Sequence, residues 1–335
     1  MRRVILTPVL VMLMTAAAHG QSKTGTTIGQ FLLIEPSARL AAMGNAGVAL
    51  SDGIQSVYYN PGALGQLEGT ELQFTHSEWF AGINYDYVAA AIPLLSVGNA
   101  FASVTVLDSG EIDVRTVDKP LGTGERYTAR DLAISLGFGS AITERFSAGA
   151  QINYIDETIW HSTLRTATLS LGTVYRLTES GVKLGASISN YGTTAKYSGR
   201  DLAIQYDNDP SRYGDNSALP GAGATDKFPV PVLFRVGLTV PQRIDEASRL
   251  LLSIDGSHPS DNSESIGFGA EWCWKESLSL RTGYQNLFLT DSEVGLTLGG
   301  GLSGRIGERR FHFDYAWADQ GRLEETHRMT FALDL

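Results

Sequence analysis

The stretch DLAISLGF, residues 131–138, has an apolar residue at every second position: Leu132, Ile134, Leu136 and Phe138. Successive side chains of a β-strand point to opposite faces, so this segment has one apolar face and one small or polar face. The same alternation runs through Ser277–Tyr284 and Glu293–Leu302, and it is broken once in each, at Thr282 and at Gly300. The pattern predicts strands with a single apolar face.

The length of these segments separates two classes of β-protein. Strands of soluble sandwiches average about five or six residues, whereas a tilted strand needs about ten to cross a bilayer. Fourteen strand-like segments of about that length occur between Thr70 and Leu335, and the connections after strands two, four, six, ten and twelve are tight. Long connections near residues 108–126 and 192–229 both follow odd-numbered strands, as in outer-membrane barrels with short periplasmic turns. We therefore expect an all-β fold: a transmembrane antiparallel β-barrel of about 14 strands over residues 70–335. Both termini of this barrel should lie in the periplasm.

The beginning of the chain has the three parts of a secretory signal peptide. Met1-Arg2-Arg3 is basic, Val4–Ala17 is apolar but too short for a spanning helix, and Ala18-His19-Gly20 supplies small residues for cleavage. We expect a signal peptide over residues 1–20. Downstream of it no run of ~18 apolar residues occurs, so the sequence offers no transmembrane helix. An exported chain with barrel strands predicts a location in the cell outer membrane.

Composition and motifs argue against several function classes. The formal net charge is −10, and loss of Arg2 and Arg3 would make the mature chain more acidic, which disfavours nucleic acid as a partner. Cys273 is the single cysteine, so the chain cannot form an internal disulfide. The alternation of its strand predicts that the Cys273 side chain faces the barrel lumen. No Gly-x-Ser-x-Gly elbow and no His-x-x-x-His motif occur. We expect no enzymatic activity, no catalytic residue, no cofactor and no metal site.

Residues 21–69 do not alternate and are rich in small residues. Ser37 and Asn60 are placed to cap short helices, Pro61 stands at a first helical position, and Gly44 ends the Ala38–Met43 helix. Asp52 is placed to cap a short turn that leads to Val57. Short helices with small residues can pack tightly inside another structure. We expect an N-terminal plug of the barrel, with the candidate residues Ser37, Arg39, Gly44, Asp52, Asn60 and Pro61.

The run FLLIEPSARLAAMGNAGVALSDGIQSVYYNPGAL, residues 31–64, resembles the N-terminal signature of the PorV/PorQ family of FadL-like outer-membrane barrels. THSEWFAGINYDYVAAAIPL (75–94), SGEIDVRT (109–116) and PLGTGERYTARDLAISLGFG (120–139) are similar to PorV as well. Asn60-Pro61 matches an Asn-Pro-Ala element of FadL-like plugs, except that Gly62 replaces the alanine. From Gly139 to Leu335 the resemblance is one of topology. Pro36-Ser37-Ala38-Arg39 leans toward PorQ and the Trp79 region toward PorV, and we favour PorV.

The resemblance implies fourteen strands, an N-terminal plug and a role in type IX secretion. PorV-like barrels receive cargo that carries a C-terminal secretion domain from the translocon and pass it to a surface attachment complex. FadL-like relatives instead move hydrophobic molecules across the outer membrane. A mainly structural barrel is a third alternative. Expected partners are therefore outer-membrane lipid together with type IX translocon and cargo, or a hydrophobic ligand.

The inward faces of the strands consist mostly of Gly, Ser, Thr and scattered charges. This arrangement favours an interaction protein over a transporter with an apolar lumen. Two interpretations of the charges stay open: a selectivity cluster or carboxylate clamp for a ligand, or a charge network that fixes the plug to the wall, since confined charges need partners. The candidate residues are Asp131, Arg235, Asp255, Glu271, Arg281, His312 and Asp314.

Overall fold

The computed structural model describes residues 24–335 except 96, 208, 210, 212–217 and 290–291. The expected signal peptide, residues 1–20, lies outside the described residues. Fourteen long strands form one antiparallel sheet. They are β1 (Glu71–Glu78), β2 (Asn84–Leu94), β3 (Gly98–Asp108), β6 (Ala129–Ala141), β7 (Phe146–Ile159), β8 (Ser162–Arg176), β9 (Lys183–Gly192), β13 (Leu233–Arg243), β14 (Ser248–Pro259), β15 (Ser265–Trp274), β16 (Leu278–Leu287), β17 (Leu296–Ile306), β18 (Arg309–Asp319) and β19 (Glu325–Asp334).

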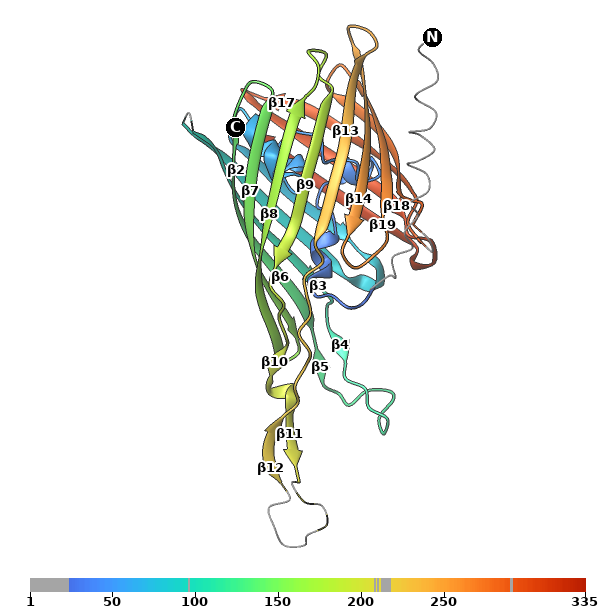
Figure 1. Ribbon diagram of the computed structural model, residues 1–335. Coiled ribbons are helices and arrows are strands. Elements are labelled where there is room, and N and C mark those ends of the chain that lie inside the picture. Colours follow the sequence, from blue (N-terminus) through green and yellow to red (C-terminus); the bar gives the residue numbers. More distant parts are fainter. Residues whose placement is uncertain (1–23, 96, 208, 210, 212–217, 290–291) are drawn as a thin grey trace, which may run out of the picture.

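The sheet closes on itself into a barrel. The first strand, β1, pairs with the last, β19, from Glu71↔Asp334 to Glu78↔His327. Every other strand pairs with its neighbours along the chain, including β9 with β13 across the longest connection. Closure removes the free edges that would otherwise expose unpaired backbone groups to lipid. The predicted 14-stranded barrel is confirmed (Figure 1).

The outer surface of the wall is apolar, as the alternation predicts. In β6, Ile134 and Leu136 are 43% and 65% exposed, whereas Ser135 between them is 5% exposed. On the neighbouring strand Ile152 is 61% exposed and Asn153 is buried. An exposed apolar band on a closed barrel is stable only where lipid covers it. The chain is therefore a membrane-spanning barrel of the bacterial outer membrane.

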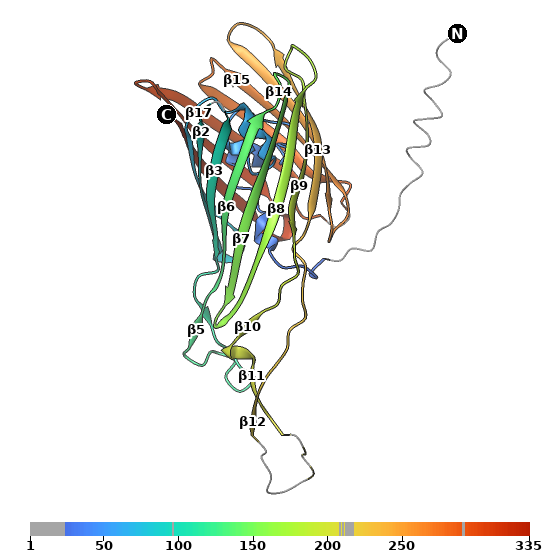
Figure 2. The same ribbon diagram turned by 60° about the vertical axis from the view of Figure 1, so that its left-hand side comes forward.

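The two ends of the barrel differ in the length of their connections. At one end, here called the short-turn end, the strands are joined by turns of two to six residues. The other end, the long-loop end, carries the connections 109–128 and 193–232, whose described residues project away from the barrel (Figures 1 and 2). The short strand β10 (Ser198–Gly199) pairs with the end of β8 and belongs to the same sheet. The elements outside the sheet are β4 (Ile112–Asp113), β5 (Arg126–Tyr127), η5 (Arg200–Leu202), β11 (Ala203–Tyr206) and β12 (Leu219–Ala222), with η4 (Phe80–Gly82) and η6 (Gly321–Leu323) between barrel strands.

The N-terminal segment, residues 24–69, enters the barrel at one end, and most of it lies inside (Figures 1 and 2). It contains four short helices: η1 (Gln30–Leu33), α2 (Ala38–Ala41), η2 (Ile54–Ser56) and η3 (Pro61–Gln66). No helix among the described residues is long and apolar enough to cross a membrane.

This segment runs through the lumen from end to end. Ile28 donates its backbone N–H to Pro229 at the long-loop end, whereas Thr70 accepts from Leu335 at the short-turn end. The first strand of the barrel therefore begins, and the last strand finishes, at the short-turn end, as predicted. The described chain itself begins at the long-loop end.

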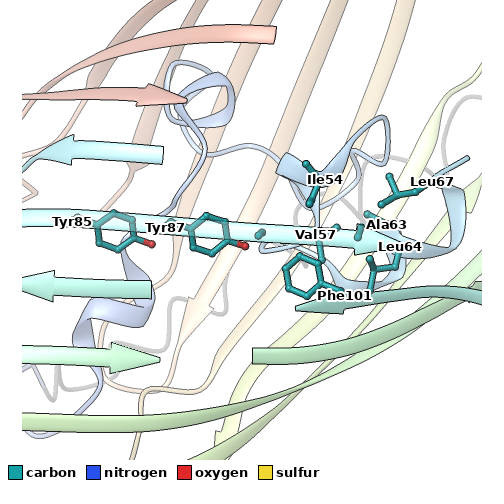
Figure 3. Close-up of a cluster of buried hydrophobic side chains, with 10 residues drawn as sticks. Ile54, Val57, Ala63, Leu64, Leu67, Tyr85, Tyr87 and Phe101 are labelled. Atoms are coloured by element: carbon teal, nitrogen blue, oxygen red, sulfur yellow. The ribbon is translucent and has the colours of Figure 1, made fainter. Parts of the chain in front are cut away.

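Figure 3 shows an apolar cluster between the N-terminal segment and the wall. Ile54, Val57 and Leu64 pack against inward side chains of β2 and β3, among them Tyr85 and Phe101. The expectation of a small, polar and charged inner face is therefore wrong for β2, which turns Tyr85 and Tyr87 inward, whereas in β3 it is wrong at Phe101 and agrees with buried Ser103 and Thr105. The physical reason is that this part of the wall faces packed protein, so its inner residues form a conventional core.

Candidate functional site

Inward glycines of the wall allow the N-terminal segment to approach the strands closely. A Cβ placed on Gly149 in β7 would lie 2.1 Å from the Pro61 carbonyl oxygen. A Cβ on Gly172 in β8 would lie 2.0 Å from Asn60 Oδ1, and one on Gly185 in β9 would lie 2.0 Å from the Val48 carbonyl oxygen. Real Cβ atoms do not reach such distances, so only glycine fits. The segment is therefore seated against the wall by backbone contact.

The predicted caps Ser37 and Asn60 also tie the segment together. Ser37 Oγ accepts from the Leu40 N–H at 3.1 Å, which caps α2. Asn60 Oδ1 accepts from the Gly62 N–H at 2.9 Å, which caps η3 with Pro61 at its first position. Asn60 Nδ2 donates to the carbonyl oxygen of Thr173 in β8 at 2.8 Å. Asn60 thus both starts a helix and anchors it to the wall.

Gly44 follows α2 with a left-handed backbone, φ 61°. Its N–H donates to Thr297 Oγ1 in β17 at 3.0 Å. A Cβ here would lie 2.5 Å from the Phe268 carbonyl oxygen, so backbone conformation and space both require glycine. The helix α2 ends at Ala41, two residues before the predicted end at Met43, and a tight turn leads from there to Gly44.

Arg39 is the centre of a buried charge network. Its guanidinium makes two hydrogen bonds to Asp52, both 2.9 Å, and two to Glu271 in β15, at 2.8 and 3.0 Å. Arg281 in β16 continues the network, since it donates to Glu271 Oε2 and to Asp314 Oδ1, each at 2.7 Å. Three of the predicted luminal charges are therefore bonded into one chain that includes two residues of the N-terminal segment.

Asp52 does not cap the turn that leads to Val57, which corrects the sequence prediction. The helix η2 has Gly53 at its N-cap with no side-chain cap, and Glu71 Oε2 accepts the Ile54 N–H at 2.6 Å instead. The carboxylate of Asp52 faces Arg39, a stronger partner than a backbone amide. Burial raises the pKa of Asp52, but the Arg39 guanidinium lowers it by more, and the net pKa lies well below its usual range.

The remaining predicted charges are dispersed along the lumen. Asp255 in β14 accepts from the Val48 N–H at 2.7 Å, and Arg235 in β13 lies 4.0 Å from Glu35. Asp131 stands opposite Glu157 near the long-loop end. His312 is hydrogen-bonded to Ser303 at 2.8 Å at the short-turn end, where it lines the same cavity as Glu271, Arg281 and Asp314. Four of the seven predicted residues therefore meet at one cavity, and Asp131, Arg235 and Asp255 do not line it.

A cavity of about 290 Å³ opens at the long-loop end, between the N-terminal segment and the wall. Its lining combines seven apolar side chains with ten polar or charged ones and two glycines. The apolar part includes Leu33, Ile34, Leu233, Pro259, Leu289 and Val294. We call this space the mouth cavity.

The charged groups of the mouth cavity are Glu35 and Arg235, and a side pocket that shares Glu35 and Trp79 with it contains Arg328. Sequence reasoning did not single out Glu35 or Arg328, and it named the Trp79 region only in the resemblance to PorV. Arg328 follows the inward phase of β19, which could have indicated it, but nothing in the sequence shows that the N-terminal segment brings Glu35 to the same place.

A second cavity, of about 220 Å³, lies at the short-turn end. Its lining is strongly charged and includes Arg39, Asp52, Glu271, Arg281 and Asp314. The described residues contain no group of three or more His, Cys, Asp or Glu side chains placed to hold a metal ion. Cys273 is buried, in agreement with its predicted inward position.

Comparison with known proteins shows which solved structures have a similar fold. No protein-family model and no curated protein matches the chain. The Pseudomonas putida toluene transporter TodX superposes with a TM-score of 0.55 at 13% identity, over 90% of this chain and 97% of that chain. The CymD monoaromatic hydrocarbon channel gives 0.52 at 12% identity, over 90% and 97%. A Pseudomonas aeruginosa FadL homologue gives 0.49 at 9% identity. At this identity the likeness to TodX and CymD concerns the fold, which is that of FadL-like barrels.

Proposed function

We propose that this protein takes up small hydrophobic molecules across the outer membrane and that the mouth cavity is where they first bind. The cavity is the observation that carries the proposal. It is concave and opens at the long-loop end, and apolar side chains such as Leu33, Leu233 and Leu289 lie beside a larger number of polar ones, so its apolar part can contact the body of a small ligand. The fold supports the same class of function, because TodX is a toluene transporter and CymD a monoaromatic hydrocarbon channel.

In this proposal residues 24–69 act as a plug that moves in part during transport. A hydrophobic molecule that continued straight toward the short-turn end would meet the Arg39–Glu271 network and the charged cavity beside it. Displacing or burying those charges next to an apolar ligand is expensive. Passage therefore requires a local rearrangement of the segment, and the wall strands keep their hydrogen bonds throughout.

The test is uptake of radiolabelled toluene by intact Gram-negative cells that express the protein. Ser257 lines the mouth cavity from β14, and Ser257→Trp should fill much of it and slow uptake. Ile254→Trp places the same side chain on the lipid face of that strand, where Ile254 is 45% exposed, and should leave uptake unchanged. Equal uptake by cells with and without the protein would refute the proposal.

A second candidate function rests on a different observation, the two hairpins that project from the long-loop end. The pairs β4–β5 and β11–β12 extend into solvent on the same side of the barrel (Figures 1 and 2). Long structured loops of this kind are typical binding elements. Together with the resemblance to the PorV/PorQ family, they favour a receiver of cargo in type IX secretion.

The second candidate is tested by removing the outer hairpin at its base. Leu202 accepts the Gly223 N–H at 2.7 Å, so residues 203–222 can be replaced by an Asn-Gly turn with little strain. A cargo receiver should then lose co-purification with translocon or cargo, and the barrel should still assemble. Unchanged co-purification would exclude the hairpin as the receiving surface.

A further inference from the structure

Glu157 of β7 is a buried carboxylate that two separate parts of the chain share at the long-loop end. Its side chain belongs to a residue that is 5% exposed. Glu157 Oε1 accepts the backbone N–H of Gly29, in the N-terminal segment, at 2.5 Å. Glu157 Oε2 accepts the hydroxyl of Tyr197, in the long connection 193–232, at 2.7 Å. One side chain of the wall therefore fastens the start of the N-terminal segment and the long connection at the same point.

The part of the long connection that carries Tyr197 consists of two short stretches, residues 195–197 and 225–230, which we call the loop base. Ala195 and Phe228 exchange both of their backbone hydrogen bonds, at 2.9 and 2.8 Å. Thr225 Oγ1 donates to the carbonyl oxygen of Tyr197 at 3.0 Å. Because these bonds join the two stretches, a displacement of either one moves Tyr197 as well.

The loop base also contacts the N-terminal segment directly. Ile28 donates its backbone N–H to the carbonyl oxygen of Pro229 at 3.0 Å. Side chains of the segment, the loop base and the wall are buried in one apolar cluster, which contains Ile28, Phe31, Val230, Ile155 and Leu164, with Tyr197 and Phe228 packed against it. Since the same two parts share a carboxylate, a backbone hydrogen bond and an apolar cluster, we expect them to open and close as one local unit.

A second carboxylate opposes this arrangement. Asp131 in β6 is the direct register partner of Glu157 and follows the inward phase of its strand. Like charges directly opposite each other on neighbouring strands are destabilising. The Gly29 N–H and the Tyr197 hydroxyl offset this repulsion, because hydrogen bonds to an ionised acceptor are strong. Loss of either donor leaves Glu157 beside Asp131 with less compensation.

We propose that Glu157 is a latch through which the long connection holds the start of the N-terminal segment in place. While Tyr197 and Gly29 both donate to Glu157, the loop base and residues 28–31 stay ordered together. When the loop base is displaced, Glu157 loses the Tyr197 hydroxyl and Ile28 loses its acceptor on Pro229. A contact made outside the barrel is thereby transmitted to the segment inside it. The latch goes beyond both candidate functions, since it concerns control of the segment and not what the protein carries or receives.

The wall holds the outer part of the long connection independently of the latch. The strand β10 pairs with the end of β8, and Asp201 accepts the backbone N–H of His161 at 2.8 Å. The hairpin β11–β12 lies beyond these contacts. Removal of the hairpin should therefore leave the latch closed, whereas a change at Tyr197 should open it.

Hydrogen–deuterium exchange with mass spectrometry on the full-length barrel in detergent micelles tests the latch. Tyr197→Phe removes one hydroxyl from the loop base and should speed exchange of the amides of residues 28–33 about tenfold or more, as expected for loss of a hydrogen bond to a charged group. Tyr206→Phe makes the same change in β11, where Tyr206 is 52% exposed, and should leave those amides as in the native chain. Replacement of residues 203–222 by Asn-Gly should leave them unchanged too. Unchanged exchange of residues 28–33 in Tyr197→Phe would overturn the proposal.

Two further variants give expectations of opposite sign. Asp131→Asn removes the charge opposite Glu157 and should slow exchange of residues 28–33 and of the loop base together. Glu157→Met removes both acceptor oxygens and should speed exchange in the same two regions. Faster exchange in Asp131→Asn would contradict the latch, and so would a change confined to one of the two regions in Glu157→Met. If Glu157→Met does not fold, the comparison of Tyr197→Phe with Asp131→Asn decides the matter.

Discussion

Arg39 and Glu271 are joined by two hydrogen bonds across 232 positions of the sequence, Nε to Oε2 at 2.8 Å and Nη2 to Oε1 at 3.0 Å. One residue belongs to the segment inside the barrel and the other to strand β15 of the wall. Their side chains are 12% and 2% exposed. Because Asp52 shares Arg39 and Arg281 shares Glu271, the pair couples the position of the segment to the register of the wall.

Arg39→Met should destabilise the barrel strongly. The substitution leaves Asp52 without Arg39 and leaves Glu271 hydrogen-bonded to Arg281 alone, so the cost should approach but not exceed that of breaking a fully buried pair, about 3–5 kcal/mol. Unfolding by guanidinium chloride in detergent micelles measures the change. The control is Arg165→Met, since Arg165 pairs with Asp156 on the outer surface and should matter little.

A double-mutant cycle separates the pair from its surroundings. If Arg39 and Glu271 act together, Arg39→Met/Glu271→Met should cost clearly less than the sum of the two single changes. Additive costs would show that the two side chains stabilise the protein independently, and the coupling described above would be incorrect.

Gly149→Ala should loosen the N-terminal segment. The new Cβ would lie 2.1 Å from the Pro61 carbonyl oxygen, so η3 must shift or the strand must bend, at a cost of about 1–3 kcal/mol. Limited proteolysis of residues 24–69 in the refolded barrel reports the loosening. Gly256→Ala is the control, because the nearest atom to its added Cβ is 3.8 Å away. Equal protease sensitivity of the two variants would contradict the role assigned to Gly149.

Much of the fold follows from local pattern. The alternation that begins at Leu132 and Ile134 depends on the period of a strand and on lipid outside the wall, and both are readable in the sequence. The caps Ser37 and Asn60 depend on neighbouring residues and are equally readable. The same is true of Gly44, whose left-handed backbone follows α2.

The site depends on contacts that local pattern does not encode. Asp52 looks like a helix cap in the sequence, but a buried Arg39 thirteen positions earlier takes its carboxylate. Tyr85 and Phe101 face the lumen because the N-terminal segment fills it there, and alternation alone assigns a side without saying what covers it. The meeting of Glu35 with Arg235 and Arg328 likewise arises from the path of the segment through the barrel.

The long-loop end should face the outside of the cell. Leu121, in the first long loop, is 96% exposed, and Ser180 lies in the turn between β8 and β9 at the other end. In a Cys273→Ser background, Leu121→Cys should react with a membrane-impermeant maleimide on intact cells, and Ser180→Cys should react after permeabilisation. Labelling of Ser180→Cys on intact cells would reverse the orientation.

Charge on the lipid face should be costly at the depth of Ile134. Ile134 is 43% exposed on the outer surface of β6 between Leu132 and Leu136, so Ile134→Arg would place a cation among lipid chains. A cost of about 2–4 kcal/mol is expected near the midplane of the bilayer. Ile134→Met is the control, because it changes the shape of the side chain without adding a charge. An arginine at Ser135, on the inner face, is not a suitable control, because Ser135 is buried and the larger side chain would clash there. Reversible unfolding of the barrel in lipid vesicles gives both values. If Ile134→Arg were as stable as Ile134→Met, this face of β6 would not lie in the membrane.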